Sequence, residues 1–119
     1  LTHLSTHLLG PSSTPYSSGI YHLTLTIPST YPTSPPTATF HTKIFHPNIC
    51  ARTGDVCVDT LKRDWNPRLT LRDVLITIRC LLVWPNHESA LNEEAARLMA
   101  EGEGRFEERA RVWAEVHAR

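Results

Sequence analysis

The chain has 119 residues, of which 40% are hydrophobic and 20% are charged, as is typical of one globular domain with a hydrophobic core. Twelve basic residues balance twelve acidic residues, so no excess of positive charge indicates binding to nucleic acid. No apolar run reaches membrane-spanning length, and no signal peptide opens the sequence. We therefore expect a single domain over residues 1–119, with neither nucleic acid nor a membrane as a partner.

The first half of the sequence predicts three strands. Residues 2–9 carry a weak strand pattern, and residues 21–27 alternate strictly between apolar and polar side chains. Four prolines within residues 28–36 exclude a strand there and predict a rigid, extended connection. Residues 38–44 alternate again, so the three strands are expected to form an antiparallel meander. Residues 46–65 show no periodicity and predict a long irregular loop of the kind that carries function.

The second half predicts helices. Thr70, with Asp73 three residues later, resembles a capping box and begins a helical pattern that Pro85 ends. Ser89 is the expected N-cap of a second helix, and Gly102 separates that helix from a third. Strands followed by helices, rather than alternating with them, predict an α+β domain.

The loop and its surroundings contain a set of short motifs in a fixed order. The motifs are Tyr31-Pro32 with Pro35-Pro36, His46-Pro47-Asn48, Gly54-Asp55-Val56-Cys57, Trp65, and Pro85-Asn86. This ordered set, which covers nearly the whole chain, resembles the ubiquitin-conjugating enzymes. The resemblance implies the fold of that family, with Cys57 as the nucleophile that carries ubiquitin as a glycyl thioester and passes it to a lysine amine. It also implies that Asn48 stabilises either the oxyanion or the active-site loop.

Cys57 on its own has a simpler interpretation, because Val56 and Val58 flank it and a free cysteine is often a small buried apolar residue. The resemblance gives structural roles at the site to His46, Pro47, Trp65 and Ser89. Asp59 and Glu93 are candidates for orienting the acceptor lysine, although a solvated position or a helix-dipole contact explains both equally well.

Two other chemistries are conceivable for the same residues. His41, His46, Cys50 and Cys57 lie close in sequence, but no C-x-x-C pair accompanies them, so no metal site is expected. A protease-like pair of Cys57 with His46 is conceivable, but the resemblance gives the histidine of His-Pro-Asn a structural role. Cys80 is expected to face the core or the edge of its helix.

The three cysteines are an odd number and their spacing does not pair them, so we expect a reducing compartment, cytoplasmic or nuclear. The sequence begins at Leu1 in a strand pattern, and the first helix of the family has no counterpart, so we expect the domain to be N-terminally incomplete.

Within the family, residues 61–65 and 88–95 are most similar to the enzymes that elongate lysine-eleven-linked chains with the anaphase-promoting complex. The resemblance thus implies three partners: ubiquitin, a ubiquitin-activating enzyme, and a ubiquitin ligase, for which that complex is the candidate. It implies no bound cofactor, since the activating enzyme consumes the ATP. The alternative is a non-catalytic variant of the same fold that binds ubiquitin or another partner.

Overall fold

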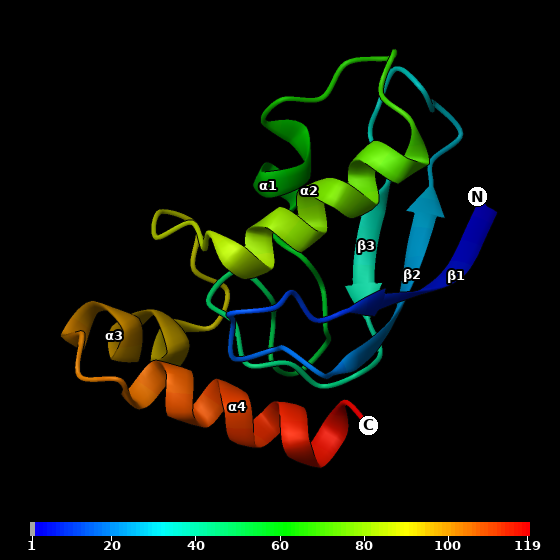
Figure 1. Ribbon diagram of the computed structural model, residues 1–119. Helices are drawn as coiled ribbons and strands as arrows, with labels where there is room; N and C mark the ends of the chain where they lie inside the picture. The colour runs from blue at the N-terminus through cyan, green and yellow to red at the C-terminus, as the bar shows by residue number, and fades with distance from the viewer. Residues whose placement is uncertain (1) are drawn as a thin grey trace.

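The computed structural model describes residues 2–119. Its elements are β1 (Thr2–Leu9), β2 (Ile20–Ile27), β3 (Thr37–Phe40), α1 (Val58–Lys62), α2 (Leu71–Val83), α3 (Glu93–Glu101) and α4 (Arg105–His117). The strands form one antiparallel sheet in the order β1-β2-β3, and the helices follow it in the chain (Figure 1). The predicted α+β meander followed by helices is therefore confirmed.

The sheet is apolar on one face and polar on the other. Tyr21, Leu23 and Leu25 of β2 are buried, whereas His22 between them is exposed, as the strict alternation of this strand predicts. Helix α2 crosses the sheet on the apolar side, and its residue Ile78 is fully buried (Figure 1). One continuous core therefore lies between the sheet and the helices.

The third strand is shorter than predicted. It ends at Phe40 rather than continuing to residue 44, because the N–H groups of His41 and Thr42 both point at the carbonyl of His22, at 2.8 and 3.4 Å. Two donors on one acceptor end the regular ladder. Ile44 is nevertheless buried, so the apolar pattern correctly predicted the burial of this residue but not its secondary structure.

The helix boundaries confirm one capping prediction, correct another, and add a helix to the predicted loop. Thr70 and Asp73 form the predicted capping box at the start of α2. Helix α3, however, begins after Asn92, whose side-chain oxygen accepts a hydrogen bond from the N–H of Ala95, so the prediction of Ser89 as its N-cap was wrong. The loop expected over residues 46–65 also contains the short helix α1.

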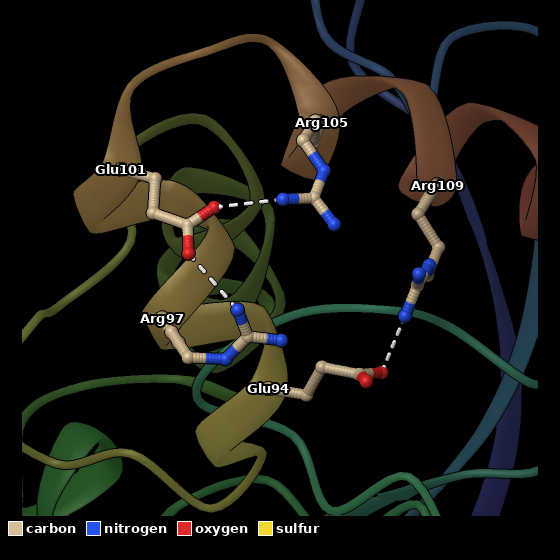
Figure 2. Close-up of polar contacts among 5 residues, drawn as sticks. All are labelled: Glu94, Arg97, Glu101, Arg105 and Arg109. Carbon is tan, nitrogen blue, oxygen red and sulfur yellow. Dashed lines mark hydrogen bonds and ion pairs between the residues drawn. The ribbon is translucent and has the colours of Figure 1, made fainter.

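Helices α3 and α4 pack side by side and are joined by surface ion pairs. Glu101 accepts hydrogen bonds from Arg97 at 2.9 Å and from Arg105 at 3.1 Å, while Glu94 pairs with Arg109 (Figure 2). The last turn of the chain returns to the sheet, where the carbonyl of Ala118 accepts a hydrogen bond from Ile20 at 3.1 Å. Within residues 2–119, no helix combines the length and the apolar character that crossing a bilayer would require.

Candidate active site

The predicted nucleophile and the predicted asparagine lie next to each other because the chain between them folds back on itself. The N–H of Cys57 donates to the carbonyl of Asn48 at 2.9 Å, Ile49 forms an antiparallel bridge with Val56, and the N–H of Cys50 donates to the carbonyl of Asp55 at 2.9 Å. Residues 48–57 thus form a hairpin. Its pairing brings together two residues that are nine positions apart in the sequence.

The hairpin is attached to the edge of the sheet beside β3. The N–H of Val56 donates to Ala38 at 3.0 Å, and the N–H of Phe40 donates to the carbonyl of Gly54 at 2.8 Å. Gly54 has φ +83°, and a Cβ atom at this position would lie 1.9 Å from the carbonyl oxygen of Phe40. Only glycine fits both the left-handed conformation and this close approach, so Gly54 fixes the hairpin on the sheet.

Cys57 is the last residue before α1, at the N-cap position. Its side chain makes no capping hydrogen bond, and its carbonyl accepts from the N–H of Thr60 at 3.1 Å. The thiol is free, and the residue is 7% exposed. The structure therefore places an unbonded thiol just below the surface, at the end of the hairpin and the start of a helix.

The side chain of Asn48 is fully buried and clamps the hairpin to the loop that follows α2. Its amide nitrogen donates to the carbonyl oxygens of Asn86 at 2.6 Å and Ser89 at 3.0 Å, and its Oδ1 accepts from the N–H of Asn86 at 2.8 Å. Both amide hydrogens are therefore engaged with main-chain oxygens. The same contacts explain why Ser89 does not begin a helix, because its carbonyl accepts a hydrogen bond from Asn48 within this loop.

His46 is buried with both ring nitrogens engaged. The N–H of Asn48 donates to its Nδ1 at 3.0 Å, so Nε2 carries the proton and donates to the carbonyl of Leu81 at 2.8 Å. Burial of the ring lowers the pKa of His46 from its usual 6.5 to about 4. The ring is thus neutral at physiological pH and has no nitrogen free to take a proton from Cys57, which argues against the protease-like pair.

Pro47 and Trp65 connect the hairpin to other segments. The carbonyl of Pro47 accepts from Leu91 at 2.8 Å and from Asn92 at 3.0 Å, which fixes the entry into α3. The indole N–H of Trp65 donates to the carbonyl of Pro32 at 3.0 Å, so it ties the segment after α1 to the proline-rich connection. The residue is half-buried and packs against the core.

Asp59 and Glu93 are both exposed and lie in the first turns of α1 and α3. The helix dipole favours an acidic residue at either position. Cys80 lies on the exposed side of α2, so it does not face the core. Within residues 2–119, no three histidine, cysteine, aspartate or glutamate side chains gather closely enough to hold a metal ion.

Sequence reasoning missed how two residues, Leu81 and Asn86, hold this site through their main chains. The carbonyl of Leu81 orients His46, and the N–H and carbonyl of Asn86 hold Asn48. A residue's type does not reveal which side chain its main-chain groups will bind. The N-cap Asn92, in contrast, had a usable signal, because asparagine is a strong N-cap and two glutamates follow it.

Comparison with known proteins defines the class. A model of the family described as "Ubiquitin-conjugating enzyme" matches residues 1–114, and the chain belongs to this family. A protein from Drosophila melanogaster named "Ubiquitin-conjugating enzyme E2 S" is 48% identical over 118 residues, which are 99% of this chain and 56% of that protein. A protein of the same name from Nematostella vectensis is 45% identical over 119 residues, which are 100% of this chain and 58% of that protein. The chain thus spans little more than half the length of these relatives.

The fold is shared with solved structures. The E2 domain of a ubiquitin conjugating enzyme from Toxoplasma gondii is 39% identical and superimposes with a TM-score of 0.88, covering 97% of this chain and 79% of that one. The architecture described above is therefore the fold of the ubiquitin-conjugating enzymes.

Proposed function

We propose that this chain is the catalytic domain of a ubiquitin-conjugating enzyme that carries ubiquitin on Cys57 and transfers it to a lysine amine. The observation that carries the proposal is the hairpin of residues 48–57, in which the main chain of Cys57, a free cysteine at the start of α1, pairs with that of Asn48. The chain's family membership supports the same reaction.

The chemistry has two steps. The thiolate of Cys57 attacks the thioester carbonyl between ubiquitin and the activating enzyme, and the cysteine thiolate of that enzyme leaves. A lysine amine then attacks the new thioester, the thiolate of Cys57 leaves, and the amine nitrogen gives up a proton as the amide forms. ATP is consumed upstream by the activating enzyme, so this domain requires no cofactor of its own.

In this proposal, Asn48 acts by holding Cys57 in place. Its clamp on Asn86 and Ser89 holds the loop after α2 against the hairpin, and the hairpin in turn holds Cys57. A donor aimed at the oxyanion of an acyl-transfer step is worth roughly 2.7–4 kcal/mol of barrier. For the amide of Asn48 to act as this donor, one of its hydrogens must leave a main-chain oxygen.

The decisive experiment is a charging assay with ubiquitin, activating enzyme and ATP. We expect the parent protein to form a conjugate that a thiol reductant removes, and Cys57→Ser to form only a reductant-resistant one. Cys80→Ser is the matched control, because its thiol lies on the exposed side of α2. The proposal fails if Cys57→Ser gives the same reductant-sensitive conjugate as the parent, or if neither is charged.

The second candidate is a binding module that holds ubiquitin or another partner without being charged. The low exposure of Cys57, 7%, favours it, because an attacking thiol must reach the carbonyl. In this case, titration of ubiquitin into the labelled protein shifts NMR signals, while the charging assay gives no conjugate with either the parent or the Cys80→Ser protein.

Within the proposed activity, we assign this chain to the subclass that elongates lysine-eleven-linked chains, with the anaphase-promoting complex as its ligase and the cytoplasm or nucleus as its location. The similarity of residues 88–95 to that subclass supports the assignment, and Glu93 lies exposed in the first turn of α3, where a carboxylate can meet an acceptor lysine. Asp59, exposed in the first turn of α1, is the second candidate for this contact.

The linkage assignment is tested by Glu93→Gln, with Glu94→Gln as the matched control, since Glu94 is the next residue and its carboxylate pairs with Arg109 (Figure 2). Mass spectrometry of the chains made by each protein should show a reduced share of lysine-eleven linkages for Glu93→Gln only. An identical linkage profile for the parent and Glu93→Gln would contradict the assignment.

A further inference from the structure

The polar face of the sheet, which lies opposite α2, carries an unusual number of histidines. His3, His7, His22 and His41 are all exposed, and they come from β1, β2 and the residue after β3. The site proposed above uses none of them. His3 contacts the hydroxyl of Thr26 at 3.1 Å, and His41 contacts the hydroxyl of Thr24 at 2.6 Å.

His7 and His22 differ from the other two because their rings contact each other. They are directly opposite in the pairing of β1 with β2, and their ring centroids are 4.3 Å apart with the planes at 70°. Directly opposite residues in an antiparallel pair have side chains close enough to act on one ligand.

We propose that His7 and His22 together bind a divalent transition-metal ion of the class that prefers imidazole, such as Ni²⁺, Cu²⁺ or Zn²⁺. A metal–nitrogen bond of 2.0–2.1 Å places a ring centroid about 3.2 Å from the ion. Two rings bound at neighbouring positions are then roughly 4.5–5.2 Å apart, for bond angles between square-planar and tetrahedral geometry. The observed separation of 4.3 Å is close to this range.

Only a small rearrangement is needed to bind the ion. The edge of one ring now faces the plane of the other, so the rings must turn about χ2 for one nitrogen of each to face a common ion. The χ2 torsion of histidine has broad wells, and both side chains are exposed, so this turn costs little. Water completes the coordination, because the site has two protein ligands and is open to solvent.

Binding here joins the edge strand to the rest of the sheet. Leu8 is the one buried residue of β1, so this strand is held mainly by its main-chain pairing with β2. An ion that binds the paired strands and not the separated ones stabilises the pair. With free ion at 100 times its Kd, separation of β1 from β2 becomes roughly a hundredfold less favourable.

The test uses Ni²⁺, which is paramagnetic, in a chelator-free buffer. In a ¹⁵N-labelled sample, the amide signals of residues around His7 and His22 should broaden first, and calorimetry should give the Kd. We expect His7→Gln and His22→Gln each to weaken binding at least tenfold, while His41→Gln, on the same face, binds within twofold of the parent.

Two outcomes overturn the proposal. One is broadening that starts around the cysteines or His87 rather than on β1 and β2. The other is a pattern of Kd values that does not single out the pair, in which His7→Gln and His22→Gln both bind like the parent or His41→Gln loses as much affinity as they do. Neither outcome depends on charging with ubiquitin, so the proposed function is tested separately.

Discussion

The buried ring of His46 makes a specific prediction about stability in acid. Its Nδ1 accepts from the N–H of Asn48 and its Nε2 donates to the carbonyl of Leu81, so the folded protein needs the neutral ring. Adding a proton to Nδ1 would set two N–H groups against each other inside the core. The folded state therefore resists protonation of this ring, whereas the unfolded chain accepts the proton at the ordinary histidine pKa.

The magnitude follows from the difference in pKa. Burial lowers the pKa of His46 from 6.5 to about 4 in the folded protein. At a pH between these values the unfolded state binds one more proton than the folded state, so stability falls with falling pH by about 1.4 kcal/mol per pH unit. The stability that the neutral ring of His46 contributes to the fold is complete above pH 6.5 and is lost as the pH falls toward 4. The loss is about 2 kcal/mol between pH 7.5 and 5 and about 3 kcal/mol in all.

Urea unfolding followed by far-UV circular dichroism at pH 7.5, 6.5, 5.5 and 5.0 measures this loss. His87→Gln is the matched control, because His87 is exposed and the variant should follow the parent. His46→Gln should be less stable at pH 7.5 but should show a flatter dependence on pH. If His46→Gln does not fold, an NMR titration of the imidazole carbons in the parent gives the same information. An unfolding free energy of the parent that is constant from pH 7.5 to 5, or an NMR pKa near 6.5 for His46, would refute the reasoning.

Two further predictions concern residues that hold the site, and a third concerns the ion pairs of α3 and α4. Asn48→Ala should lower the unfolding free energy in urea by about 3 kcal/mol, because it leaves three main-chain groups without partners, the N–H and carbonyl of Asn86 and the carbonyl of Ser89. Gly54→Ala should cost roughly 2–4 kcal/mol in the same assay, since its Cβ would meet the carbonyl of Phe40 in a left-handed conformation; a loss below 0.5 kcal/mol would contradict this. Glu101→Gln should cost at most about 1 kcal/mol in 50 mM NaCl, and the difference from the parent should vanish in 1 M NaCl.

The elements that sequence predicted well are those with a local cause. The alternation of residues 21–27 follows directly from one buried face of β2, and the capping box of Thr70 and Asp73 needs only residues three apart. The motif around Cys57 predicts a candidate site in one loop, and the structure shows that residues 48–57 of this loop form a hairpin. These features depend on side chains near each other in the chain, and such side chains can be read from the sequence.

The elements that sequence predicted poorly are set by distant contacts. β3 ends at Phe40 because of the carbonyl of His22, which is about twenty residues away in the chain. The start of α3 is delayed to Asn92 because Asn48 and Pro47 hold the preceding loop by its main chain. Helix α1 has five residues, too few to establish a helical period.

The sequence is compatible with two roles for Asn48, stabilising the oxyanion or holding the active-site loop. The contacts of its side chain bear on which role it has. An amide nitrogen has two hydrogens, and in this structure both point at main-chain oxygens, those of Asn86 and Ser89. To stabilise an oxyanion the side chain must give up one of these bonds, at a net cost of about 1 kcal/mol set against the roughly 2.7–4 kcal/mol that a preorganised donor supplies. In this structure the side chain of Asn48 serves the clamp, and any electrostatic contribution from it requires one of its hydrogen bonds to Asn86 or Ser89 to break. Since the loop of residues 86–89 also leads to the entry of α3, where Glu93 lies, loss of that bond would link the proposed chemistry at Cys57 to the position of the proposed acceptor-orienting carboxylate.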